Sequence, residues 1–206
     1  MFDFAAQSMS QTIRPNAQNA ALIREARREV EAPLADITAL DSLDLGVYIG
    51  VHIRRGDRKA EAWPHLGSYV PVDMFGDAVV SGWNRLLPAS PLQASQSAPV
   101  IWISTDSPEA HKNFTHLSSL PKGTKLFSLA RSSNEELRTL ASPKEYDQSE
   151  FVQMAYEDRV RLTRGAIIDF AMLSGMWVWE GEARPMATVC TLRYVLTSIQ
   201  VKMPYD

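Results

Sequence analysis

The sequence contains one cysteine, Cys190, among its 206 residues. A single cysteine cannot build an internal disulfide framework, so the class of small disulfide-stapled secreted domains is excluded. The scarcity fits a reducing compartment and leaves a secretory one open. Long apolar runs are also missing: none approaches the roughly 20 residues of a membrane-spanning helix, so we expect no membrane segment in this chain. The first residues, Met1-Phe2-Asp3-Phe4, lack the basic region and apolar core of a signal peptide.

Excess positive charge is a second absence. The 21 lysines and arginines are outnumbered by 24 aspartates and glutamates, which gives a net charge of -3. Without a basic field, a basic arm or an aromatic RNA-binding signature, we expect no nucleic-acid partner. The GxGxxG, P-loop, HExxH and GxSxG motifs are absent, and His65, His111 and His116 lack metal-ligand spacing with one another or with Cys190. The sequence therefore gives no support to the enzyme classes that these motifs mark.

What is present is typical of a globular domain. Apolar residues make up 45% and charged residues 22% of a chain long enough for one sizeable core. We expect residues 1–17 to be a polar arm and residues 18–206 to form a single domain. Strands alternate with helices along the chain, and this alternation predicts an α/β fold with a largely parallel sheet.

Two buried strands are predicted from their β-branched and aromatic content, at 47–53 and 99–106. Helices are predicted at 18–32, ended by Pro33, at 72–87, at 108–120 with Ser107 as N-cap, and at 149–174 with a break near Gly165. The remaining predicted segments are short strands at 125–129, 186–189 and 194–201, a linker at 88–99 and a polar active-site or surface loop at 130–150.

The first strand ends in a cluster of charge formed by His52, Arg54 and Arg55. Alternation along a strand places His52 and Arg54 on one face and Arg55 on the other. Two adjacent guanidinium groups at a strand end are an anion clamp suited to phosphate. The alternative is a surface network of ion pairs with the acidic residues Asp57, Glu61 and Asp169.

Two carboxylates follow apolar segments. Asp106 stands at the tip of the second strand, where it could contact a ligand or hold the N-terminus of the next helix. Asp169 follows two isoleucines on a predicted helix, and a carboxylate so placed is rarely buried without a partner. That partner could be an arginine or the N1–H and N2–H₂ edge of a guanine, which an acceptor-only carboxylate matches.

Three segments, taken in order, resemble motifs of the fucosyltransferase superfamily, which includes α-1,6-fucosyltransferases, bacterial nodulation fucosyltransferases and protein O-fucosyltransferases. They are residues 50–58, residues 101–106, and residues 164–174 followed by 189–191. Their order and approximate spacing agree with the α-1,6 branch. The resemblance covers about residues 46–191, mostly the nucleotide-binding half of such an enzyme.

The resemblance implies a fold and an activity. The fold would be a Rossmann-like parallel sheet with flanking helices, as in the C-terminal, donor-binding half of a GT-B glycosyltransferase. GDP-fucose would be the donor, and fucose would pass to a glycan or protein hydroxyl with inversion. Neither a metal nor another cofactor is implied. The family places such an enzyme in the Golgi or ER lumen.

The resemblance also implies roles for residues near the first motif. Arg54 would bind the β-phosphate and stabilise the departing GDP, and Arg55 would support the same region. Glu61 would take the proton from the acceptor hydroxyl, although its alignment needs a gap of one residue.

Further residues are implied to bind the substrate: His52, Asp57, Arg58, Asp106, Arg164, Asp169 and Thr191. His52 and Asp169 would hold the guanine and ribose end of the donor. Asp57 and Arg58 would orient the site, and Asp106 would close it.

The chain departs from the family in ways that favour other hypotheses. Leu192-Arg193 stands where the family has a Ser-Ser pair that contacts phosphate, residues around 177–184 look inserted, and no acceptor-side domain is recognisable. We therefore expect a truncated chain, either a transferase's donor domain or a catalytically inactive nucleotide-binding or interaction domain. A third hypothesis is an unrelated α/β domain with a basic surface patch.

Overall fold

The structure, a computed structural model, describes residues 15–38, 48–56, 68–86, 98–174, 186–190 and 200–201. Within these ranges the chain forms a five-stranded sheet of order β3-β2-β1-β4-β5. The strands are β1 (Tyr48–Ile53), β2 (Val100–Thr105), β3 (Lys125–Phe127), β4 (Met186–Cys190) and β5 (Gln200–Val201). The first four run parallel, and β5 pairs antiparallel with β4. The predicted α/β class with a largely parallel sheet is confirmed.

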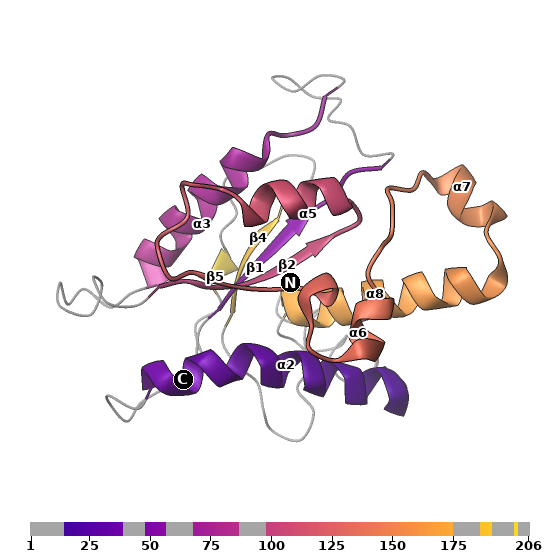
Figure 1. The fold of residues 1–206 in the computed structure, drawn as a ribbon, viewed down its shortest axis with the longest axis horizontal. Helices are drawn as coiled ribbons and strands as arrows, with labels where there is room; N and C mark the ends of the chain where they lie inside the picture. Colours follow the sequence, from indigo (N-terminus) through magenta and orange to yellow (C-terminus); the bar gives the residue numbers. More distant parts are fainter. Residues whose placement is uncertain are drawn as a thin grey trace, which may run out of the picture.

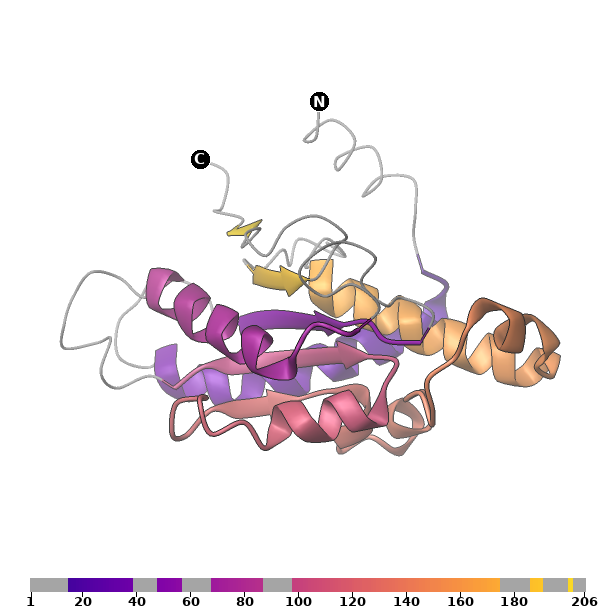
Figure 2. The same ribbon diagram turned by 90° about the horizontal axis from the view of Figure 1, so that it is seen from above.

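The two faces of the sheet bury different sets of side chains. Ile49, Val51 and Ile53 of β1 face α3 (Val72–Leu86) and α5 (Pro108–Thr115), with which they share one apolar cluster. Tyr48 and its neighbours Val100 and Trp102 on β2 instead pack with α2 (Ala17–Thr38) and α8 (Tyr156–Ser174). Helices therefore cover the sheet on both sides, as the two views show (Figures 1 and 2). The strict alternation along β1 also fixes His52 on the α2–α8 side.

The winding of the chain reverses direction at β1. From β1 the chain passes through α3 to β2 and through α5 to β3, moving toward one edge. It then runs through η1 (Leu129–Arg131), α6 (Glu135–Thr139), α7 (Gln148–Gln153) and α8 before it adds β4 on the opposite side of β1. In doubly wound sheets, ligands bind outside the carboxyl ends of the strands at such a switch point. The fold therefore favours a ligand site at the carboxyl end of β1.

The predicted start of α5 is confirmed. The Ser107 side chain accepts a hydrogen bond from the Ala110 amide at 3.1 Å, and Pro108 stands in the first turn. The helix ends at Thr115 rather than at residue 120. The Thr115 hydroxyl and the His116 ring both contact the Lys112 carbonyl, which turns the chain out of the helix.

Two helix boundaries differ from the prediction. Pro33 lies inside α2 and does not end it. The backbone hydrogen bond that a proline cannot make is outweighed by burial of residues such as Ala26 and Val30 in the core. The single helix predicted over 149–174 is divided into α7 and α8, because Met154 adopts an extended conformation between them.

Gly165 does not break α8, which is continuous through it. Its lack of a side chain has a different use, since a Cβ there would overlap the backbone carbonyl of Leu140. Gly165→Ala is therefore expected to destabilise the protein by roughly 2–3 kcal/mol, although alanine normally favours a helix. Denaturant unfolding monitored by circular dichroism measures the change.

Gly76 on α3 is the matched control. A Cβ there would meet the ends of the Leu117 and Ser119 side chains, each at 2.8 Å, and these can rotate away. Gly76→Ala is expected to change stability by less than about 1 kcal/mol. Equal losses for the two substitutions would contradict the role assigned to the Leu140 carbonyl.

Several predicted segments lie wholly or largely outside the described residues. They are the polar arm at 1–17, the linker at 88–99, the segment around 177–184 and most of the strand predicted at 194–201. In the described part of the chain, no helix is long and apolar enough to cross a membrane.

Candidate functional site

The candidate site begins where β1 ends, at the switch point. Arg54, Arg55 and Gly56 follow the last residue of β1 directly. β2 is the neighbouring parallel strand, with Ile53 paired to Thr105, so Asp106 stands just beyond the same edge of the sheet. In both ribbon views, α7 lies on the side of the molecule toward which the arrowheads of β1 and β2 point (Figures 1 and 2).

Asp106 links the two strand ends. Its Oδ1 accepts a hydrogen bond from the Arg55 backbone amide at 2.7 Å, and its Oδ2 lies 3.2 Å from Arg54 Nη1 in an ion pair. The Arg54 side chain is 44% exposed, whereas that of Asp106 is 14% exposed. The more buried Asp106 carboxylate thus holds the exposed Arg54 side chain in place. The helix-capping role considered for Asp106 belongs to its neighbour, Ser107.

Arg55 is directed to a different environment. The residue is only 7% exposed, and its guanidinium lies over the Tyr69 ring at 4.6 Å from the ring centre. Burial lowers the pKa of Arg55, and Glu145 opposes this shift most strongly, ahead of Tyr69 and Asp106. A buried guanidinium that lies over an aromatic ring is positioned to support the strand end.

Gly56 adopts a backbone conformation that favours glycine, with φ of +60°. Its carbonyl accepts a hydrogen bond from the Tyr69 hydroxyl at 2.7 Å. A Cβ at this position would overlap the backbone carbonyl oxygen of Tyr146. The turn after β1 is therefore packed between Tyr69 and the segment that contains Tyr146.

His52 and Asp169 are brought to the same face of the sheet through Ser104. Ser104 is the register partner of His52 on β2, and its hydroxyl contributes a hydrogen bond to Asp169. Trp102 Nε1 donates a second hydrogen bond to Asp169 Oδ1 at 3.0 Å. In this structure the partners of the Asp169 carboxyl group are therefore the Trp102 indole and the Ser104 hydroxyl.

The charges of His52 and Asp169 depend on their surroundings. Burial raises the pKa of Asp169 to about 7, although the hydrogen bonds from Ser104 and Trp102 lower it. Burial also lowers the pKa of His52, with Asp106 acting in the opposite direction and Arg54 in the same direction. The neutral form of His52 is therefore favoured at neutral pH, and the neutral form of Asp169 is favoured below about pH 7.

Arg164 lies elsewhere. Its Nε donates to Asn19 Oδ1 at 3.1 Å, and its Nη2 donates to Glu136 Oε1 at 2.9 Å. These partners belong to α2 and α6, so Arg164 joins three helices and does not stand at the strand ends. Its implied role in substrate binding stays a prediction.

The other implied site residues fall outside the described ranges. They are Asp57, Arg58, Glu61 and Thr191. Two residues that the sequence did not single out act on Arg55: its guanidinium lies over the Tyr69 ring, and the charge of Glu145 opposes the lowering of its pKa. The only signal for Glu145 was its place in the polar loop predicted at 130–150, and no local pattern indicated Tyr69.

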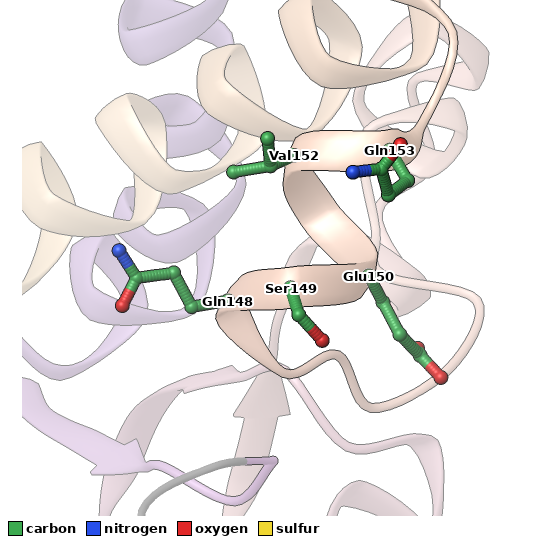
Figure 3. Close-up of a pocket in the computed structure, with 5 residues that line it drawn as sticks. All are labelled: Gln148, Ser149, Glu150, Val152 and Gln153. Atoms are coloured by element: carbon green, nitrogen blue, oxygen red, sulfur yellow. The ribbon is translucent and has the colours of Figure 1, made fainter.

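The described residues also outline a hollow, which lies at α7. It is lined by Gln148, Ser149, Glu150, Val152 and Gln153, all exposed and all on this one short helix (Figure 3). None of them is among the implied site residues, and Glu150 is the single charged group. The concentration of charge at the ends of β1 and β2 therefore makes those strand ends the better candidate site.

Among the described residues, no three His, Cys, Asp or Glu side chains gather in a way that could hold a metal ion. No protein-family model, curated protein or solved structure matches the chain. The fold and the site together define a doubly wound α/β domain with an arginine pair at its switch point.

Proposed function

We propose that this domain binds GDP-fucose at the carboxyl end of β1 and, with an acceptor-binding domain, transfers fucose to a glycan or protein hydroxyl. The observation that carries the proposal is the Arg54 side chain, 44% exposed at the switch point and paired with the more buried Asp106. An arginine whose rotamers are already restricted loses less entropy when it binds a phosphate. The order of the three fucosyltransferase-like motifs supplies the identity of the nucleotide and the sugar.

The proposal assigns each end of the donor to a part of the strand edge. The β-phosphate lies at Arg54, whose fork of N–H donors matches its oxygens. The guanine and ribose extend toward His52 and Asp169 on the α2–α8 side. Asp169 accepts guanine donors only when it is ionised, and a guanine edge competes there with Trp102 and Ser104.

The proposed transfer is a displacement at the anomeric carbon of fucose. The bond from that carbon to the β-phosphate oxygen breaks, and its electron pair leaves with GDP toward Arg54. The acceptor oxygen forms the new bond from the opposite face, and its proton passes to the carboxylate of Glu61. No metal or other cofactor takes part in this scheme, and the Golgi or ER lumen is the proposed compartment.

A second candidate function is nucleotide binding without transfer. It is favoured by Leu192-Arg193, which replaces the Ser-Ser pair of the family. The two candidates agree on GDP binding and differ in products. Release of fucose or a fucosylated acceptor from GDP-fucose by the chain would exclude the second.

Arg54→Ala is expected to weaken GDP binding roughly 10- to 100-fold, because a charge-assisted hydrogen bond is worth about 1.5–3 kcal/mol. Arg54→Lys should give an intermediate affinity, since lysine keeps the charge and loses the planar fork. Isothermal titration calorimetry of the full chain with GDP, with ADP and UDP for comparison, measures these differences.

Arg24→Ala is the matched control, because Arg24 is an exposed arginine on α2. It should leave GDP affinity within about twofold of the original value. The proposal is wrong if the unchanged chain binds no GDP at millimolar concentration. It is also wrong if Arg24→Ala weakens binding as much as Arg54→Ala.

A further inference from the structure

A segment between α6 and α7, residues 141–147, covers the turn after β1; we call it the connector. The backbone carbonyl of its residue Tyr146 occupies the space that a side chain at position 56 would need. The preceding residue, Glu145, accepts a hydrogen bond from the Ser107 hydroxyl at the start of α5. The connector therefore contacts the ends of both β1 and β2.

Glu145 is also the carboxylate that acts most strongly on Arg55. Arg55 is buried, and Glu145 opposes the lowering of its pKa more than Asp106 or Glu109 does. Glu145 thus accepts a hydrogen bond from the Ser107 hydroxyl and acts through its charge on the Arg55 guanidinium. These are the groups that a phosphate oxygen accepts from in a binding site.

The other attachments of the connector are local and exposed. Lys144 forms a 2.9 Å ion pair with Glu150 on α7, and the Ser142 hydroxyl donates to the Lys144 carbonyl at 2.8 Å. Asp147 caps the start of α7. These contacts hold the connector to α7 and would move with it. The hydrogen bond from the Ser107 hydroxyl to Glu145 ties the connector to the strand ends.

We propose that Glu145 is a built-in competitor for phosphate, and that the connector must withdraw before a nucleoside diphosphate can bind fully at the strand ends. The inference rests on the proposed function, because it takes the diphosphate to bind beside Arg54 and Arg55. Withdrawal exposes the Gly56 backbone and returns the Arg55 charge and the Ser107 hydroxyl to the ligand. A diphosphate offers more acceptor oxygens to these donors than the single carboxylate of Glu145 that it displaces.

The test is the affinity of the full chain for inorganic pyrophosphate, measured by calorimetry. Glu145→Ala is expected to bind pyrophosphate about tenfold more tightly than the original chain, because an internal competitor worth about 1.4 kcal/mol lowers apparent affinity by that factor. Glu145→Gln keeps the shape and removes the charge, and should bind roughly threefold more tightly. Unchanged or weaker binding in both variants overturns the proposal.

Glu150→Gln is the matched control, since it removes one negative charge from the next helix and leaves the Ser107 contact intact. It should change pyrophosphate affinity by less than about twofold. A gain equal to that of Glu145→Gln would show that net charge alone is responsible, which also overturns the proposal.

Hydrogen exchange on the original chain provides a second measurement that needs no substitution. Saturating pyrophosphate is expected to speed exchange of the amides in residues 142–147 and to leave β1 and β2 protected. Slower exchange there would mean that the ligand binds with the connector closed, and would overturn the proposal.

The outcome for GDP separates this inference from the proposed function. If Glu145→Ala tightens pyrophosphate binding and GDP binds no better than ADP or UDP, the connector mechanism stands and the guanine assignment fails. If GDP binds selectively and Glu145→Ala changes nothing, the proposed function stands and the competitor role fails. If none of the chains binds either ligand, both fail.

Discussion

Gly56→Ala is expected to destabilise the protein by roughly 3 kcal/mol or more. The positive φ of +60° at this residue costs an alanine about 1–2 kcal/mol, and overpacking costs about 1–3 kcal/mol more. The overpacking is severe because a Cβ would overlap the Tyr146 carbonyl oxygen and lie 3.3 Å from Asp106 Oδ2. Denaturant unfolding of the full chain measures the loss.

Gly123→Ala separates the two contributions. Gly123 also has a positive φ, of +91°, but among the described residues a Cβ there would meet only the Ala98 Cβ, at 3.3 Å. Its expected cost is about 1–2 kcal/mol, from the backbone alone. A Gly56→Ala protein no less stable than the Gly123→Ala protein would contradict the close packing of the connector over the end of β1.

Asp169→Asn is expected to make the protein more stable above pH 7. The pKa of Asp169 is about 7 in the folded protein and 3.8 for the unperturbed group. Between these values the folded chain holds a proton that the unfolded chain has lost, so stability falls as pH rises toward 7. The fall is on the order of 4 kcal/mol, since each pKa unit corresponds to about 1.36 kcal/mol. Asparagine stays neutral and can still accept from Trp102.

The difference in unfolding free energy between Asp169→Asn and the original chain should therefore be larger at pH 8 than at pH 5. His52 contributes the opposite slope, because burial lowers its pKa, and it is present in both proteins. Asp77→Asn is the control for the loss of an exposed aspartate, on α3. A difference for Asp169→Asn that is equal at pH 5 and pH 8 would contradict burial of the carboxyl group.

The sequence predicted those parts of the fold whose causes are local. The strand at 47–53 and the helix start at Ser107 follow from apolar runs and capping chemistry, and the structure has both. Pro33 and Gly165 were misjudged because their effects depend on partners far along the chain. The first lies in a helix buried against the core, and the second lies against Leu140.

For the candidate site too, the sequence predicted only the residues whose positions follow from local patterns. Arg54, Arg55 and Asp106 follow apolar strands, and the rule for strand ends in parallel sheets brings them together. Glu145 gave no such signal, because it belongs to a polar segment some ninety residues after Arg55. The partners of Asp169 were missed for a related reason. In the sequence Trp102 is one apolar residue of a buried strand, and only the packing of α8 against β2 brings Asp169 to its indole N–H.

The reversal of winding at β1 also sets an order of assembly. During synthesis, β1, β2 and β3 emerge with α3 and α5 between them, so this half of the sheet can pair early. The other side of β1 has to wait, because Tyr48 pairs with Met186 near the opposite end of the chain. Such a distant pairing closes slowly. β4 therefore joins the sheet after β1, β2 and β3, and a chain interrupted before β4 would carry the arginine pair on an open edge.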